Sequence, residues 1–383
     1  MTRLYGKLKW FIVVALICRP YAGHSYPQYI AKGYTTCASC HYSPSGGGLA
    51  NSYGHSTLQA TFPDSVKVPF LEELRRKIAK HDVTGFGQDK SPEFQWDLGL
   101  DTRLMFLPVP KTVNGDDEPA FIPMLIEGGG VAAYGPVLAY GTLTPRRAGS
   151  TRTPNTVFSR EHWLQYKFSD RWSVRGGRVV LPFGLRIPDH TQYTREDLGF
   201  DHWDQSYGVE ADYGTVKWTI NAAGFFGDFW LDPTEIQQRG GVASVTYQIP
   251  SRAAVGTSVL ASASESTWRA AASLFLRLRM WKSVYGMGEV SPHYEKGKNV
   301  GSSQSGIASL LRVGWFPIES LDLYFEWGGR GIFNEYDLTK LRYMLGANWQ
   351  VLPWMELAPA LFLEEDAESG MHVTGFGQIH IIY

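Results

Sequence analysis

The chain has 383 residues and a formal net charge of −1, so its charge gives no reason to expect nucleic acid as a partner. Hydrophobic residues make up 44% of the sequence and the mean hydropathy is −0.20, which argues against a membrane protein built from helices. These values do not exclude a membrane β-barrel, because a barrel strand turns only every second residue toward lipid.

The first 23 residues have the pattern of an export signal. Basic residues occur within 3–9, an apolar run covers 10–18, and a cleavage region lies at 20–22. This order is typical of a secretory signal peptide, which is removed from the mature protein. A short membrane anchor and a lipid attached at Cys18 are the alternatives, but the apolar run is short for a span. We predict that residues 1–23 are cleaved.

A Cys-x-x-Cys-His motif occupies residues 37–41 and predicts a c-type haem attachment site. Cys37 and Cys40 are spaced to form thioethers with the two vinyl groups of one haem, and His41 follows as the proximal iron ligand. A redox disulfide would need a βαβ setting, and a structural zinc site would need two further ligands. The sequence offers neither, so we predict one covalent haem c held by these three residues.

Residues 24–92 are expected to form a small monohaem unit around this motif. The turn at 43–48 contains three consecutive glycines, whose backbone can approach a haem edge closely; a flexible linker is the alternative. Residues 71–78 carry apolar side chains at i, i+3 and i+7, which predicts a short amphipathic helix with a solvated charged face.

The second axial ligand of the iron is less well defined by the sequence. Methionine is absent between residues 24 and 104, so a ligand from this unit would be a histidine. His55 is the nearest candidate, with His81 and His24 behind it, and a ligand from elsewhere or water stays open. A second imidazole would give a lower reduction potential than methionine would. We therefore name His41 and His55 as the candidate iron ligands.

From residue 93 onward, apolar and polar residues alternate with a period of two. Runs of about ten such residues predict strands that face lipid on one side and an aqueous lumen on the other. Clear runs occupy 94–106, 216–222, 268–278, 307–315, 321–327, 341–349 and 355–363. We predict an all-β fold for 93–383, a transmembrane antiparallel barrel of about 16 strands preceded by the small haem unit as a plug.

The connections and the end of the chain fit the same architecture. Short turns such as 316–320 alternate with longer polar segments such as 292–305. The last strand-like stretch, 375–383, ends on the aromatic Tyr383, a feature in which it resembles outer-membrane barrels. A soluble β-sandwich or propeller is the alternative, but it would not need so many outward Trp and Leu side chains. The predicted location is therefore the bacterial outer membrane, in contact with lipid.

Charged residues are expected on the inward faces of the strands. Most should line the lumen, and some could pair with haem propionates: Asp97, Asp101, Arg103, Arg312, Lys340 and Arg342. One segment differs in kind, because proline and glycine within 177–186 break the strand before the loop 188–195. We expect this chain segment to leave the barrel wall and fold into the lumen; a plain extramembrane loop is the alternative.

Two short motifs carry a resemblance to known families. Pro182-Phe183-Gly184, after a strand that ends in Gly-Arg, resembles the same segment of phosphate-selective-type porins. The Cys-x-x-Cys-His unit, followed by the glycine turn and by Tyr53-Gly54 just before a barrel, resembles the fused monohaem cytochrome–porins of the outer membrane. Some of these serve iron oxidation in bacteria that draw electrons from outside the cell.

The resemblance covers the whole architecture, although its motifs are short. It implies that Cys37 and Cys40 are the thioether positions and that His41 is the proximal ligand. The chain departs from the iron-oxidiser pattern in the triple glycine and in His55, where a basic residue would be expected, and it is somewhat short. These departures leave the electron donor open.

The predicted function is electron transfer across the outer membrane. One haem can relay electrons through about 30 Å of hydrocarbon only if it lies inside the lumen. A periplasmic cytochrome or another redox carrier would serve one mouth, and an extracellular donor or acceptor, such as ferrous iron, the other. The chain would then be an electron-transfer haem protein rather than a classical enzyme.

Two other functions stay open at this point. The barrel could be a diffusion porin for small, anionic solutes, with a haem unit that regulates it or docks a partner. An iron with an open position could instead carry out peroxide or nitrogen-oxide chemistry.

The His55 assignment makes a direct prediction. Substitution His55→Ala should remove the second axial ligand and change the low-spin absorbance spectrum of the haem protein. An unchanged spectrum would remove His55 from the set of iron ligands.

Overall fold

The structure is a computed structural model. It describes residues 27–35, 39–51, 53–54, 57, 94–108, 120–145, 157–187, 192–196, 198–200, 204–228, 236–298, 303–333, 335–352, 355–366 and 370–382. Several sequence predictions fall outside the described residues: the signal peptide 1–23, Cys37, His55, and the helix at 71–78.

Strands account for most of the described chain. They are β1 (Gln95–Leu107), β2 (Ala120–Tyr134), β3 (Val137–Pro145), β4 (Val157–Phe158), β5 (His162–Lys167), β6 (Trp172–Val180), β7 (Gln205–Gly214), β8 (Trp218–Phe225), β9 (Arg239–Ile249), β10 (Ala253–Ala263), β11 (Thr267–Trp281), β12 (Val284–Gly297), β13 (Ser303–Ile318), β14 (Leu321–Ile332), β15 (Glu335–Leu352), β16 (Met355–Asp366) and β17 (Gly370–Ile382). The short helices are η1 (Pro27–Lys32) and α4 (Tyr193–Glu196). No helix in the described part of the chain is long and apolar enough to cross a membrane.

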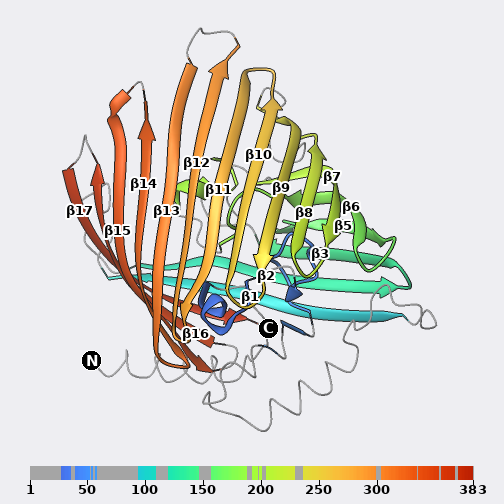
Figure 1. Cartoon of the computed structure of the whole chain (residues 1–383), viewed down its shortest axis with the longest axis horizontal. Helices are drawn as coiled ribbons and strands as arrows, with labels where there is room; N and C mark the ends of the chain where they lie inside the picture. Colours follow the sequence, from blue (N-terminus) through green and yellow to red (C-terminus); the bar gives the residue numbers. More distant parts are fainter. Residues whose placement is uncertain are drawn as a thin grey trace.

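The strands form one closed antiparallel barrel (Figure 1). Neighbours in the chain pair with one another, and β1 pairs with β17, where Thr102 lies opposite Ile381. The two-residue β4 pairs only with the end of β3, so sixteen of the strands formed by the described residues make up the barrel. Closure satisfies the backbone of every strand and leaves no edge for another chain. The predicted barrel and its strand number are confirmed.

The outer surface of the barrel is apolar, as the alternation predicted. On β11, Trp268, Leu274 and Leu276 are 57%, 63% and 42% exposed, while Ser273 and Phe275 on the other face are buried. Other outward apolar side chains continue this belt: Leu98, Leu311, Trp315, Leu345, Trp349 and Leu361. A belt of this kind on a closed barrel is suited to contact with lipid acyl chains.

One predicted connection is shorter than expected. The polar stretch 292–305 was expected to be a long loop, but β12 continues to Gly297 and β13 begins at Ser303. The pairing runs on from Pro292 opposite Ile307 to Lys296 opposite Ser303. Polar side chains mark the end of a lipid-facing belt, but they do not end the backbone pairing, so the hairpin extends beyond the apolar zone.

The two ends of the barrel differ in their connections. At one end the strands are joined by short turns, at 135–136, 215–217, 250–252, 282–283 and 319–320. At the other end some spacings between strands are much longer, among them 108–119, 226–238 and, longest of all, 181–204 between β6 and β7. In outer-membrane barrels short turns face the periplasm and longer loops face outward. We call these the short-turn end and the long-loop end.

Two segments of the chain itself lie in the lumen. We call the described residues of 27–57 the N-terminal unit. We call the described residues of 181–200 the lumen loop. Tyr42 and Leu49 of the unit and Phe183 and Phe200 of the loop belong to one buried apolar cluster with inward residues of the wall. η1 lies near the short-turn end, because Lys32 Nζ is 3.5 Å from Glu319 Oε1 in a turn there.

The apolar belt gives a testable prediction. Leu274→Arg, near the middle of β11, should destabilise the barrel by about 2–4 kcal/mol in lipid vesicles, because it places a charge at the bilayer midplane. Ile318→Arg is the matched control, because Ile318 is 57% exposed but is the last residue of β13, next to the short turn 319–320, and it should cost about 0–1 kcal/mol. Urea unfolding measures both values. Equal costs would mean that the belt does not face lipid.

Candidate functional site

His41 lies buried in the N-terminal unit, with 4% of its surface exposed. Its Nδ1 is 2.9 Å from the carbonyl oxygen of Gly48. A carbonyl can only accept, so Nδ1 carries the proton and Nε2 is left unprotonated. Nε2 is also buried and has no hydrogen-bond partner in the described part of the chain. A histidine held by a backbone carbonyl at one nitrogen, with the other open, is the arrangement of a metal ligand.

The electrostatic surroundings of His41 favour the neutral ring. Burial lowers the pKa of His41 to about 4; the bond to Gly48 acts in the opposite direction, and the nearby charge of Arg186 lowers the pKa further. The imidazole is therefore neutral near pH 7, which is the form that binds iron.

The backbone path of the turn after His41 requires glycine. Gly46, Gly47 and Gly48 have φ values of +84°, +79° and +67°, a left-handed path that other residues rarely adopt. A Cβ at Gly48 would lie 2.7 Å from the Oη of Tyr140 on the barrel wall. The turn can therefore press against the wall and offer the Gly48 carbonyl to His41.

Asn51 links two segments of the unit, residues 39–41 and residues 51–54. Its Nδ2 donates to the carbonyl oxygens of Ser39 at 3.1 Å and His41 at 3.2 Å, and its Oδ1 accepts from the Gly54 N–H at 2.9 Å. Cys40, which is 9% exposed, belongs to the first of these segments, and its carbonyl oxygen accepts from the Asn51 N–H at 2.9 Å. The described residues of the motif, 39–41, and the Tyr53-Gly54 stretch thus form one packed unit.

Arg175 of β6 fastens the glycine turn to the barrel wall. Its Nη1 donates to Ser43 Oγ at 2.9 Å, and its Nη2 donates to Ser45 Oγ at 2.8 Å and to Glu210 Oε2 at 2.8 Å. The side chains of Arg175 and Glu210 are fully buried. The guanidinium also lies 5.1 Å from the ring centroid of Trp163, which stacks on Tyr140.

Two further contacts reach strands close to their short-turn ends. Tyr42 Oη donates to Asp97 Oδ2 of β1 at 3.0 Å, and the Leu49 N–H donates to Tyr140 Oη of β3 at 3.2 Å. The described part of the N-terminal unit is therefore bound to strands β1, β3 and β6. His41 lies inside the lumen, toward the short-turn end.

The lumen loop folds inward, as the strand-breaking prolines and glycines predicted. Its Leu185 N–H donates to Glu289 Oε2 of β12 at 2.8 Å, and its Gly184 N–H donates to Ser258 Oγ of β10 at 3.1 Å. Gly184 has φ +59°, and a Cβ there would lie 2.0 Å from Glu289 Oε1. The alternative of a plain extramembrane loop is thereby wrong for these residues.

The far part of the loop crosses to the opposite wall. Gln192 donates to Glu326 of β14, and Tyr193 Oη donates to Glu364 Oε2 of β16 at 3.0 Å. Arg195 Nη1 turns back to the carbonyl of Phe183 at 2.9 Å, next to the stacked rings of Phe183 and Phe200. Sequence reasoning missed α4 and these contacts, because four residues show no helical periodicity.

The inward charges predicted from the alternation are found in the lumen as ion pairs. Asp101 pairs with Arg103 at 3.0 Å, and its Oδ1 also lies 2.8 Å from Nε2 of His380 on β17, within hydrogen-bond distance. Arg342 pairs with Glu364 at 3.3 Å, and Arg312 pairs with Glu326. Asp101 and Arg103 share β1, whereas the partners of Arg312 and Arg342 come from neighbouring strands. The sequence predicted the inward position of these residues but not their pairing.

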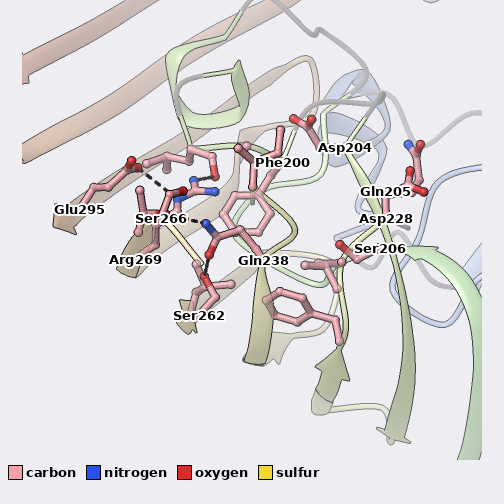
Figure 2. Close-up of a pocket in the computed structure, with 18 residues that line it drawn as sticks. Phe200, Asp204, Gln205, Ser206, Asp228, Gln238, Ser262, Ser266, Arg269 and Glu295 are labelled. Carbon is pink, nitrogen blue, oxygen red and sulfur yellow. Dashed lines mark hydrogen bonds and ion pairs between the residues drawn. The ribbon is translucent and has the colours of Figure 1, made fainter. Parts of the chain in front are cut away.

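Beside the lumen loop, toward the long-loop end, lies a polar cavity of about 310 Å³ (Figure 2). On its wall Arg269 lies 3.5 Å from Glu295 and donates to the carbonyl of Leu198 at 2.7 Å. Ser262 donates to Gln238 at 2.9 Å, and Phe200 of the loop projects into the same space. Part of the lumen therefore stays open next to the loop.

The sequence-predicted site is only partly placed. Cys40 and His41 are described and buried, whereas Cys37 and His55 are outside the described residues, so the thioether spacing and the second axial ligand stay predictions. Within the described part of the chain, no group of three or more His, Cys, Asp and Glu could hold a metal ion. The described residues fit a haem iron through one neutral imidazole nitrogen, that of His41.

The sequence matches no protein-family model and no curated protein. Its structure is similar to solved outer-membrane proteins. A loop-deletion mutant of OmpT of Vibrio cholerae aligns with TM-score 0.63 and 10% identity, over 76% of this chain and 99% of that one. The anion-selective porin of Comamonas acidovorans gives 0.58 and 12%, over 76% and 99%. The outer membrane channel DcaP of Acinetobacter baumannii gives 0.55 and 12%, over 79% and 99%.

These similarities define the fold class: the chain is a barrel of the outer-membrane porin type. Together with the apolar belt, the fold places the protein in the bacterial outer membrane, in contact with lipid. The predicted localisation is confirmed. The identities of 10–12% carry nothing beyond the fold.

The docking of the lumen loop makes a prediction. Gly184→Ala should destabilise the protein by about 2–4 kcal/mol, because it adds a methyl group against Glu289 in a left-handed backbone. Loss of the docked loop should also raise ion conductance in planar bilayers.

Gly224→Ala is the matched control, because a Cβ at Gly224 meets nothing within 4 Å. Its effect on the free energy of unfolding in urea should stay within about 0.5 kcal/mol. Equal behaviour of the two variants would contradict the docking role of Gly184.

Proposed function

We propose that this chain is a porin-type outer-membrane barrel that holds one covalent c-type haem in its lumen and passes electrons through the membrane. The observation that carries the proposal is His41. It is a buried, neutral histidine inside the lumen, fixed at Nδ1 by Gly48 and open at Nε2, directly after a Cys-x-x-Cys pair. When bound there, a haem supplies an iron that accepts and releases one electron.

The residues around His41 would serve a redox site in three ways. Gly48 orients the imidazole, and its bond makes the ring a stronger ligand. Arg175 and Asp97 fasten the unit to the wall, so the site stays at a fixed depth. The barrel surrounds the unit and separates it from the hydrocarbon. The position near the short-turn end suits exchange with a periplasmic cytochrome or another soluble redox carrier.

The second candidate function is diffusion of small solutes, and the structural similarities support it better than they support electron transfer. All three similar proteins named above are outer-membrane proteins, one a channel and one an anion-selective porin. The open cavity beside the lumen loop is a further observation in its favour. In this case the haem unit would regulate the pore or dock a partner.

The test uses the purified protein in liposomes, with a reductant outside and a trapped electron acceptor inside. Electron transfer should proceed in the wild type without leakage of small solutes. It should fall to the level of empty liposomes in Cys40→Ala and His41→Ala, because the first loses a covalent attachment and the second an iron ligand. Absorbance of the trapped acceptor measures the rate.

The controls separate the two candidates. Arg171→Gln changes an exposed residue in a short turn and should leave transfer unchanged. Free passage of solutes without electron transfer would establish the diffusion porin and reject the conduit. A wild-type protein without covalently bound haem would reject the proposed cofactor as well.

A further inference from the structure

A second, smaller cavity lies where the lumen loop meets the glycine turn of the N-terminal unit. Its volume is about 50 Å³. Ser45 comes from the unit, Arg186 from the lumen loop, and Arg277 from β11. A space of this size holds a few water molecules or one small group at the end of a larger molecule.

The lining of this cavity is one-sided in charge. Two arginines reach it, and none of the described residues that line it carries a carboxylate. The rest of the polar wall is made of neutral groups, among them Asn221, Thr246 and Gln248, which are 5–6% exposed. The larger cavity is different, since Asp204, Asp228 and Glu295 line it beside Arg269. Of these two cavities, only the small one combines positive charge with a lining that is otherwise neutral in its described residues.

Arg186 connects this cavity to the turn that orients His41. Its Nη1 donates to Ser45 Oγ at 2.6 Å, and a Cβ on Gly47 would lie 2.9 Å from its Nη2. The guanidinium thus lies over the backbone next to Gly48, whose carbonyl accepts from His41. A carboxylate bound by Arg186 would therefore lie near the candidate haem site.

We propose that this cavity is a carboxylate-binding site in which Arg186 and Arg277 hold one carboxylate group. Guanidinium groups suit a carboxylate because their planar forks can donate two parallel hydrogen bonds. The carboxylate has two sources, a propionate of the covalent haem or a free solute in the lumen. The first source rests on the proposed function, and the second does not.

The test compares the full-length wild type with Arg186→Gln and Arg277→Gln. Arg171→Gln is the control, since it removes an exposed arginine charge in the short turn between β5 and β6. Arg186→Lys and Arg277→Lys keep the charge but lose the fork, and they serve if a Gln variant fails to fold. Covalent haem is measured first on a denaturing gel. The reduction potential and the binding of succinate are then measured by redox titration and calorimetry.

A haem propionate in the cavity predicts a change in potential. Each Gln variant should shift the ratio of reduced to oxidised protein about tenfold toward oxidised at a fixed potential, which for one electron is about 59 mV. The Lys variants should shift it in the same direction by less, and Arg171→Gln should not shift it. Succinate should not bind.

A free carboxylate predicts the opposite pattern. Wild type should bind succinate, each Gln variant should weaken this binding at least tenfold, and the potential should stay unchanged. If the Gln variants keep the wild-type reduction potential and wild type does not bind succinate, the proposed carboxylate site is wrong. If wild type carries no haem, the proposed function fails. Succinate binding alone then decides whether the cavity binds a carboxylate.

Discussion

The architecture depends on the buried fork of Arg175. A guanidinium with no access to water must be matched in charge and hydrogen bonding, and Glu210 on the neighbouring strand supplies the opposite charge. Two further hydrogen bonds of the guanidinium go to Ser43 and Ser45, which belong to the N-terminal unit and not to the barrel. The same buried cation therefore links the wall to the unit, and it gives the glycine turn its fixed position. The turn held in this way also carries the Gly48 carbonyl that orients His41.

The lumen loop forms a second layer, and it meets the first at Arg186. Glu289 accepts the N–H of Leu185 where Gly184 makes room for its carboxylate. The loop then reaches the opposite wall through Tyr193 and Glu364. A porin-type barrel with two of its own segments across the lumen is suited to hold a fixed group at a defined depth. The open space left beside the loop keeps solute diffusion as a competing use of the same architecture.

Much of the barrel could be predicted from the sequence, because a lipid-facing strand must alternate. Trp268, Leu274 and Leu276 follow that rule directly, and so do the inward charges Asp101 and Arg342. The end of the β12–β13 hairpin could not be predicted this way. Backbone pairing continues through Lys296 although the side chains there are polar, and side-chain polarity reports contact with lipid rather than pairing. For the lumen loop, the sequence predicted only that the chain leaves the wall and turns into the lumen. A proline and a glycine show where a strand ends but not what the chain contacts next.

For the candidate site, the sequence by itself determined the chemistry: a Cys-x-x-Cys-His motif whose residue types and spacing suit one haem. Only the tertiary structure decided the depth of His41 in the lumen, the Gly48 carbonyl that sets its tautomer, and the approach of Arg186. The physical reason is that covalent attachment depends on residues close in the chain, which a motif records. Burial, charge matching and orientation depend on contacts that no local pattern specifies. Arg175 and Ser43, for example, are 132 positions apart, and their contact holds the turn that carries Gly48.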